Sequence, residues 1–119
     1  MRNLEGSVQK AVVIWCRAHK NPILHRIFHV PNGEKRDVIT AKRLKAQGVL
    51  AGVPDLCLPL PDNHVFWLEL KKLKGKTSKV QKVLHANWES INHHVVVAYG
   101  FVEACKELDR VGLAYGGNK

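Results

Sequence analysis

The chain is poor in cysteine and in long apolar runs, and each shortage argues against a class of protein. Its three cysteines, Cys16, Cys57 and Cys105, are odd in number, widely spaced and set among apolar residues. This spacing provides no Cys-x-x-Cys pair, so we expect reduced thiols in a core rather than disulfides or a zinc site. Apolar runs stay well short of membrane-spanning length and no apolar leader opens the sequence, so we expect a cytoplasmic protein with no membrane partner.

Acidic residues are also scarce relative to basic ones. The chain has 10 Asp and Glu against 19 Lys and Arg, and its formal net charge is +9. Such a charge attracts polyanions, which makes nucleic acid the first partner to consider. More than half of the basic residues fall into two groups: Lys35, Arg36, Lys42, Arg43 and Lys45, then Lys71, Lys72, Lys74, Lys76, Lys79 and Lys82. Contacts of these side chains with a phosphate backbone predict strong salt dependence and little base specificity.

The 119 residues fit a single domain with one core. Apolar periodicity and turn residues predict alternating helices and strands. We expect helices at about 4–19, 38–47, 77–91 and 101–108, and strands at about 27–30, 55–60, 65–72 and 95–99. The order predicts an α/β sandwich with a small mixed sheet flanked by helices. The domain core is expected at about 4–108, followed by a C-terminal tail at 109–119.

Charged residues stand in the two central strands among apolar neighbours. Asp55 begins one strand, and Glu69 and Lys71 end the next, on the face that also holds Trp67. An antiparallel hairpin brings the start of its first strand beside the end of its second, so Asp55 should lie near Glu69 and Lys71. Paired carboxylates in apolar surroundings suit Mg²⁺ or Mn²⁺. A lysine beside them could orient or help deprotonate water and stabilise charge on phosphorus, which predicts phosphodiester hydrolysis.

Each charged residue also has a simpler interpretation. Asp55 could be an ordinary turn residue after Pro54, and Glu69 with Lys71 could mark a solvent-facing strand edge. Two apparent nucleotide or metal motifs fail, because residues 75–77 lack the earlier glycine of a P-loop and His25 with His29 do not share a helix. We therefore expect no nucleotide cofactor.

With these residues the chain resembles the VRR-NUC domain, a branch of the PD-(D/E)XK nuclease superfamily with the restriction-endonuclease-like fold. Pro54-Asp55 and Glu69-Leu-Lys71 match the superfamily motif. The segment 45–56 resembles this branch around its first metal acid, and residues 78–81, Ser-Lys-Val-Gln, resemble its Ser-x-x-Gln helix start. The resemblance covers about 4–108 and departs from the family at residues 93–94, two histidines where we expect a glycine before the last core strand.

The resemblance implies a role for each matching position. Asp55 and Glu69 would hold the metal, the backbone carbonyl of Leu70 would add a ligand, and Lys71 would be the catalytic lysine. Gln81 would be a helper near the site, or else only a solvated helix residue.

One further acid belongs to the resemblance. Glu5, in the opening helix, would approach the metal site through water or a second ion. Its simpler interpretation is an acid in a first helical turn, where the helix dipole favours negative charge.

The resemblance implies a stand-alone nuclease of a bacterial or phage-infected cell. We expect an Mg²⁺- or Mn²⁺-dependent DNA endonuclease that recognises branched DNA, with the four-way (Holliday) junction as the leading substrate. Since cutting two strands needs two active sites, we also expect a homodimer. The alternatives are a non-catalytic DNA-binding module of the same fold and an RNA-directed nuclease.

Overall fold

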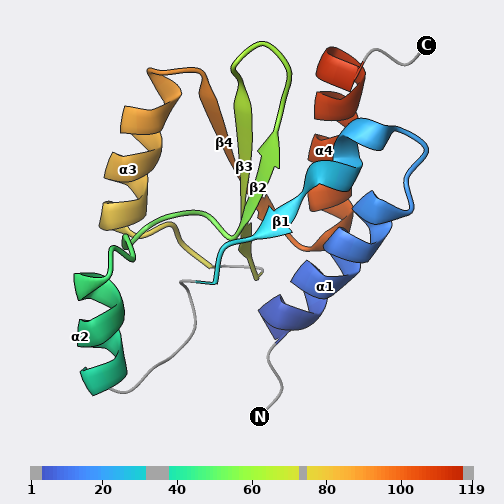
Figure 1. The fold of residues 1–119 in the computed structure, drawn as a ribbon. Helices are drawn as coiled ribbons and strands as arrows, with labels where there is room; N and C mark the ends of the chain where they lie inside the picture. Colours follow the sequence, from blue (N-terminus) through green and yellow to red (C-terminus); the bar gives the residue numbers. More distant parts are fainter. Residues whose placement is uncertain (1–3, 32–37, 73–74, 117–119) are drawn as a thin grey trace.

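A computed structural model describes residues 4–31, 38–72 and 75–116. The side chains of Leu4 and Glu5 are outside this description. It confirms the expected α/β architecture, a small mixed sheet between helices (Figure 1). The elements in chain order are α1 (Leu4–Arg17), η1 (Pro22–Arg26), β1 (Phe28–His29), α2 (Val38–Ala46), β2 (Leu56–Pro59), β3 (Val65–Lys71), α3 (Lys79–Glu89), β4 (His93–Tyr99) and α4 (Phe101–Gly116). Within these residues, no helix combines the length and the apolar character needed to cross a membrane.

The sheet contains four strands in the order β1-β2-β3-β4. The predicted hairpin is present, because β2 pairs antiparallel with β3 and Cys57 lies opposite Trp67. Strand β4 pairs parallel with β3, which places Glu69 beside Val97, and α3 forms the crossover between them. This topology brings the start of β2 and the end of β3 to the same end of the sheet.

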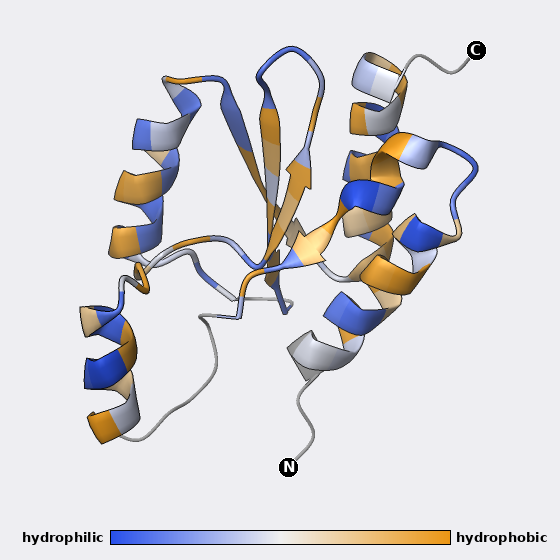
Figure 2. Ribbon diagram, in the orientation of Figure 1, coloured by the Kyte–Doolittle hydropathy of each residue, from blue (hydrophilic) through white to orange (hydrophobic). Residues whose placement is uncertain are grey.

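Helices cover both faces of the sheet. Helix α3 lies against one face, and α1, η1 and α4 lie against the other (Figure 1). The strand interiors are apolar (Figure 2), and the core centres on fully buried leucines. Phe66, Leu68 and Leu70 of β3 point into this core. On the α3 side, Trp67 packs on Trp88 with ring centroids 4.7 Å apart.

The three cysteines are free and buried, as the sequence predicts. Burial raises the pKa of Cys16 to about 12 and the pKa values of Cys57 and Cys105 to about 11. Since the thiolate is the reactive form, these thiols act as small core residues rather than nucleophiles.

The last helix is longer than predicted. It continues to Gly116 instead of ending near residue 108, so residues 109–116 are helical and not a tail. The helical spacing of Leu108, Val111 and Tyr115 extends the face that packs on the core. The side chain of Asn21 also donates to the carbonyl of Gly112 at 3.0 Å, which ties this part of α4 to the start of η1.

Two other boundaries differ from the sequence prediction. The short helix η1 was not expected; it begins at Pro22 and is capped by Asn21, whose side chain accepts from the amide of Ile23. Strand β4 begins at His93, two residues earlier than predicted. Asn92, directly before it, has a φ of 69°, so asparagine takes a left-handed turn position one residue before positions 93–94, where the family led us to expect a glycine.

Candidate metal and catalytic site

Asp55 lies just before β2 and is fixed through both its backbone and its side chain. Its carbonyl accepts hydrogen bonds from the amide of Val30 at 2.8 Å and from Nδ1 of His29 at 3.0 Å. Its carboxylate Oδ2 accepts from the amide of Leu70 at 2.8 Å. The hairpin therefore brings Asp55 to the end of β3, next to Glu69 and Lys71, as its predicted geometry requires.

Glu69 is a buried carboxylate with only 4% of its surface exposed. Its Oε2 accepts from Nε2 of Gln81 at 2.8 Å and pairs with Nζ of Lys71 at 3.2 Å. Its Oε1 is buried and has no hydrogen-bond partner among the residues that the structure describes. Burial and then the nearby Asp55 carboxylate raise the pKa of Glu69, while Lys71 and Gln81 oppose that rise.

Gln81 reaches Glu69 because it also caps α3. The hydroxyl of Ser78 accepts from the amide of Gln81 at 3.1 Å, and Oε1 of Gln81 accepts from the amide of Ser78 at 2.9 Å. This capping box uses the oxygen of the Gln81 side chain and leaves its NH₂ group to donate to Glu69. A glutamate could complete the same cap but could not donate to a carboxylate, which gives the Ser-x-x-Gln spacing a physical reason.

The donor set fits a hard divalent cation. Two carboxylates close enough to repel each other would be stabilised by a positive charge between them, all the more because one has a buried oxygen that no described residue contacts by a hydrogen bond. Mg²⁺ needs few protein ligands, because it keeps several waters of its own. Among the described side chains, no cluster of three or more His, Cys, Asp or Glu forms. The candidate protein ligands are thus Asp55, Glu69 and the carbonyl of Leu70, a β3 residue whose side chain is buried in the core.

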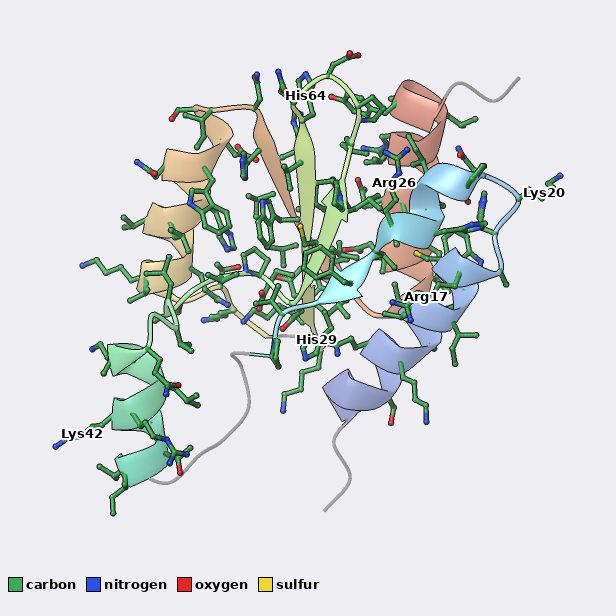
Figure 3. All side chains as sticks on the ribbon, in the orientation of Figure 1. Arg17, Lys20, Arg26, His29, Lys42 and His64 are labelled. Carbon is green, nitrogen blue, oxygen red and sulfur yellow. The ribbon has the colours of Figure 1, made fainter. Side chains whose placement is uncertain are left out.

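Some of the predicted residues lie beyond what the structure describes. Glu5 belongs to α1, but its side chain is outside the described part of the chain, as are Lys35, Arg36 and Lys74. Lys42, Arg43 and Lys45 are exposed on α2, which stands apart from the sheet, with Lys42 on its outer side (Figures 1 and 3). The remaining lysines after the site strand, Lys72, Lys76, Lys79 and Lys82, are exposed.

Two histidines near the site were missed by sequence reasoning. His85 is buried in α3, four residues after Gln81, and its Nε2 donates to the carbonyl of Gly52 at 3.2 Å. Burial lowers the pKa of His85, which favours the neutral ring. His29 lies on β1 at the site end of the sheet (Figure 3) and donates to Asp55. The one available signal was the spacing of His85 from Gln81, which puts both on one helix face.

A structural match accompanies this geometry. A scan against protein-family models found no match, and a search of curated proteins found no significant one. Among solved structures, a VRR-NUC domain protein superposes with a TM-score of 0.76 and 25% sequence identity, over 92% of this chain and 88% of that one. This match bears out the resemblance found in the sequence: the chain is similar to a VRR-NUC domain, a nuclease-type domain, and shares its restriction-endonuclease-like fold.

Proposed function

We propose that this chain is a metal-dependent DNA endonuclease that hydrolyses phosphodiester bonds. The observation that supports this most directly is the buried Oε1 of Glu69, which has no partner among the described residues and lies near a second carboxylate. Glu69 is buried and Asp55 half-buried, and two carboxylates that repel in this setting cost stability unless a cation is bound between them. The lysine paired with Glu69 adds the third group that phosphodiester hydrolysis needs.

Each side chain has a role in this proposal. Asp55 and Glu69, with the carbonyl of Leu70, would hold Mg²⁺ or Mn²⁺, and Glu5, whose side chain lies outside the described part of the chain, would add a further acid from α1. Gln81 keeps Oε2 of Glu69 occupied and so leaves Oε1 for the metal. When bound, the metal supplies Lewis acidity toward a phosphate oxygen. Lys71 orients the attacking water and stabilises the charge that develops on phosphorus.

The substrate follows from charge and size. The exposed lysines that follow β3 lie next to the proposed catalytic residues, where a phosphate backbone would have to pass. One domain of this length has little surface for reading base edges, so we propose that it recognises DNA shape. The specific proposal is cleavage of branched DNA, with the four-way junction preferred over linear duplex, by a homodimer that presents two active sites.

The test is cleavage of a labelled four-way junction and a matched linear duplex with Mg²⁺, Mn²⁺ or EDTA. Wild type should cut only with metal, and Lys71→Ala should cut about 10²- to 10³-fold more slowly while still binding the junction. Lys72→Ala is the matched control, since it removes the same charge from the next, exposed residue. That variant should lose some affinity, most of all at low salt, and keep its cleavage rate at saturating protein.

Three outcomes would contradict the proposal in different places. Binding without cleavage under any metal would indicate a DNA-binding module instead of an enzyme. Faster cleavage of a matched RNA would redirect the proposal to an RNA-directed nuclease. A monomer by size-exclusion chromatography with light scattering at micromolar concentration, with and without junction, would overturn the homodimer.

A further inference from the structure

The segment that delivers Asp55 to the site, residues 52–55, belongs to no helix or strand. Its two terminal carbonyls each accept a hydrogen bond from a histidine on a different element. The carbonyl of Gly52 accepts from Nε2 of His85 in α3 at 3.2 Å, and the carbonyl of Asp55 accepts from Nδ1 of His29 in β1 at 3.0 Å. The segment is thus tied at one end to a helix and at the other to the sheet edge.

These contacts assign the protons on both rings. A carbonyl oxygen only accepts, so His85 must hold a hydrogen on Nε2 and His29 must hold one on Nδ1. The two imidazoles therefore use different nitrogens for the same task. This difference distinguishes the two positions chemically, since a side-chain amide can replace one nitrogen but not the other.

Close packing also fixes the Gly52 end of the segment against α3. Gly52 has a φ of 93°, and a Cβ built on it would lie 3.2 Å from Cγ1 of Val80 and 3.3 Å from the Val80 carbonyl. The backbone of Gly52 thus lies directly on the first turn of α3. From that helix, Gln81 donates to Glu69 while His85 donates to Gly52, so one helix face positions both proposed metal acids.

We propose that His29 and His85 form a histidine clamp on residues 52–55 that sets the position of the Asp55 carboxylate relative to Glu69. The proposal deepens the proposed function, because it rests on Asp55 being a metal ligand. Both histidines are positioning residues that act through the backbone. Residues supporting a metal ligand in this way commonly change metal affinity or activity by about 10- to 100-fold when lost.

The clamp predicts that a different amide side chain can replace histidine at each of the two positions. The nitrogen of an asparagine side chain lies where Nδ1 of histidine lies, and that of glutamine lies where Nε2 lies. His29→Asn and His85→Gln should therefore keep the clamp, whereas His29→Gln and His85→Asn should open it. The exposed His25, which contacts neither carbonyl, is the matched control, and both of its amide variants should behave as wild type.

Two readouts separate the clamp from the proposed function. Amide hydrogen exchange of the peptide covering residues 50–58, without metal, should be at least about tenfold faster in the two mismatched variants only. Calorimetric titration with Mn²⁺ should then give a dissociation constant weakened by about tenfold in the same two variants, with kcat for junction cleavage reduced more than KM. Position 29 is half-buried, so its pair tests the clamp even if a substitution at the buried His85 prevents folding.

Equal exchange in Asn and Gln variants at position 29 would overturn the clamp, whether both are fast or both are slow. The predicted exchange pattern with unchanged Mn²⁺ affinity would overturn its role in positioning Asp55. If wild type neither binds Mn²⁺ nor cleaves while the exchange pattern holds, the clamp stands as a feature of the fold and the proposed function fails.

Discussion

The two ends of β3 carry polar clusters of opposite character. At the site end, Glu69 has a buried oxygen without a hydrogen-bond partner among the described residues, and a second carboxylate lies nearby. At the other end, Nδ1 of His64 and Nε2 of His94 lie 2.8 Å apart, and the hydroxyl of Tyr115 lies 3.2 Å from the same Nε2. Figure 3 shows His29 and His64 at these opposite ends. His29 is level with Leu68 of β3 and His64 directly precedes Val65, so the strand rise puts these two histidines roughly 13 Å apart along the sheet.

The two clusters differ in whether their side chains can satisfy each other's hydrogen-bonding groups. Imidazole and phenol each donate and accept, so His64, His94 and Tyr115 can satisfy each other inside the fold. Ionised carboxylates only accept, so Asp55 and Glu69 cannot pair and instead repel. The repelling carboxylates leave the site end electrostatically unbalanced, so we expect it to bind a cation from outside the chain, whereas the histidine and tyrosine end is balanced and needs none.

Glu69→Gln should have the largest effect on cleavage and on metal-free stability, because it removes one of the two carboxylates that repel each other. Cleavage should fall at least about 100-fold, since a neutral amide is a poor metal ligand. In EDTA the same variant should be more stable than wild type by on the order of 1 kcal/mol, because it no longer buries a charge that burial and Asp55 both disfavour. Parallel thermal melts and cleavage assays measure both, and a variant that is less stable without metal would contradict the comparison.

The same substitution has a pH signature. The pKa of Glu69 is raised in the folded protein above its ordinary value of 4.5, so the folded state takes up this proton at a higher pH than the unfolded chain does. Metal-free wild type should therefore gain stability relative to Glu69→Gln as pH falls through the raised folded-state pKa toward 4.5. The gap between the two proteins should be widest well above that pKa and narrow below it. A gap that stays constant as pH falls to 4.5 and below would show that the pKa of Glu69 is not raised in the folded protein.

Gln81 offers a smaller and more selective change. Gln81→Glu keeps an acceptor for the Ser78 amide but replaces the donor to Glu69 by a third negative charge, so cleavage should fall about tenfold while α3 stays capped. Gln81→Ala should lose both the donor to Glu69 and the side-chain acceptor of the Ser78 amide, while Ser78 still caps α3, with a stability cost of about 1 kcal/mol. Urea melts and cleavage rates of both variants separate the two roles. Equal stability loss in both would mean that the capping box does not depend on the side-chain oxygen.

Sequence reasoning predicted the elements that local chemistry determines. The hairpin followed from alternating apolar residues around a Pro-Asp-Asn turn, and the start of α3 followed from Ser78. The approach of Asp55 to the end of β3 followed from hairpin geometry alone. The extension of α4 was missed, although the helical spacing of Leu108, Val111 and Tyr115 is present in the sequence. The hydrogen bond from Asn21 to Gly112, across 91 positions, is a tertiary contact that the sequence does not reveal.

The supporting shell of the site was harder to predict than its acids. His29 and His85 act on backbone carbonyls that are distant in sequence, 26 and 33 positions away, and a backbone carbonyl leaves no signal in the sequence. The His64, His94 and Tyr115 cluster was hidden for the same reason, since it joins a loop, a strand and a helix. Charged residues in apolar runs indicate a site from the sequence alone. The neutral side chains that hold those residues in place can be identified only from the three-dimensional structure.

His64→Phe probes the balanced end and should give the smallest effect. Phenylalanine keeps the ring that stacks on His94, whose centroid lies 5.0 Å away, but loses the hydrogen bond to its Nε2. Because Tyr115 can still donate to that nitrogen, the cost should be only about 1 kcal/mol in a urea melt, with Mn²⁺ affinity and cleavage unchanged. A loss of cleavage comparable to that of Gln81→Glu would mean that the two ends of the sheet are coupled. Unchanged cleavage would mean that the site at the Glu69 end of β3 functions independently of the His64, His94 and Tyr115 cluster at the other end.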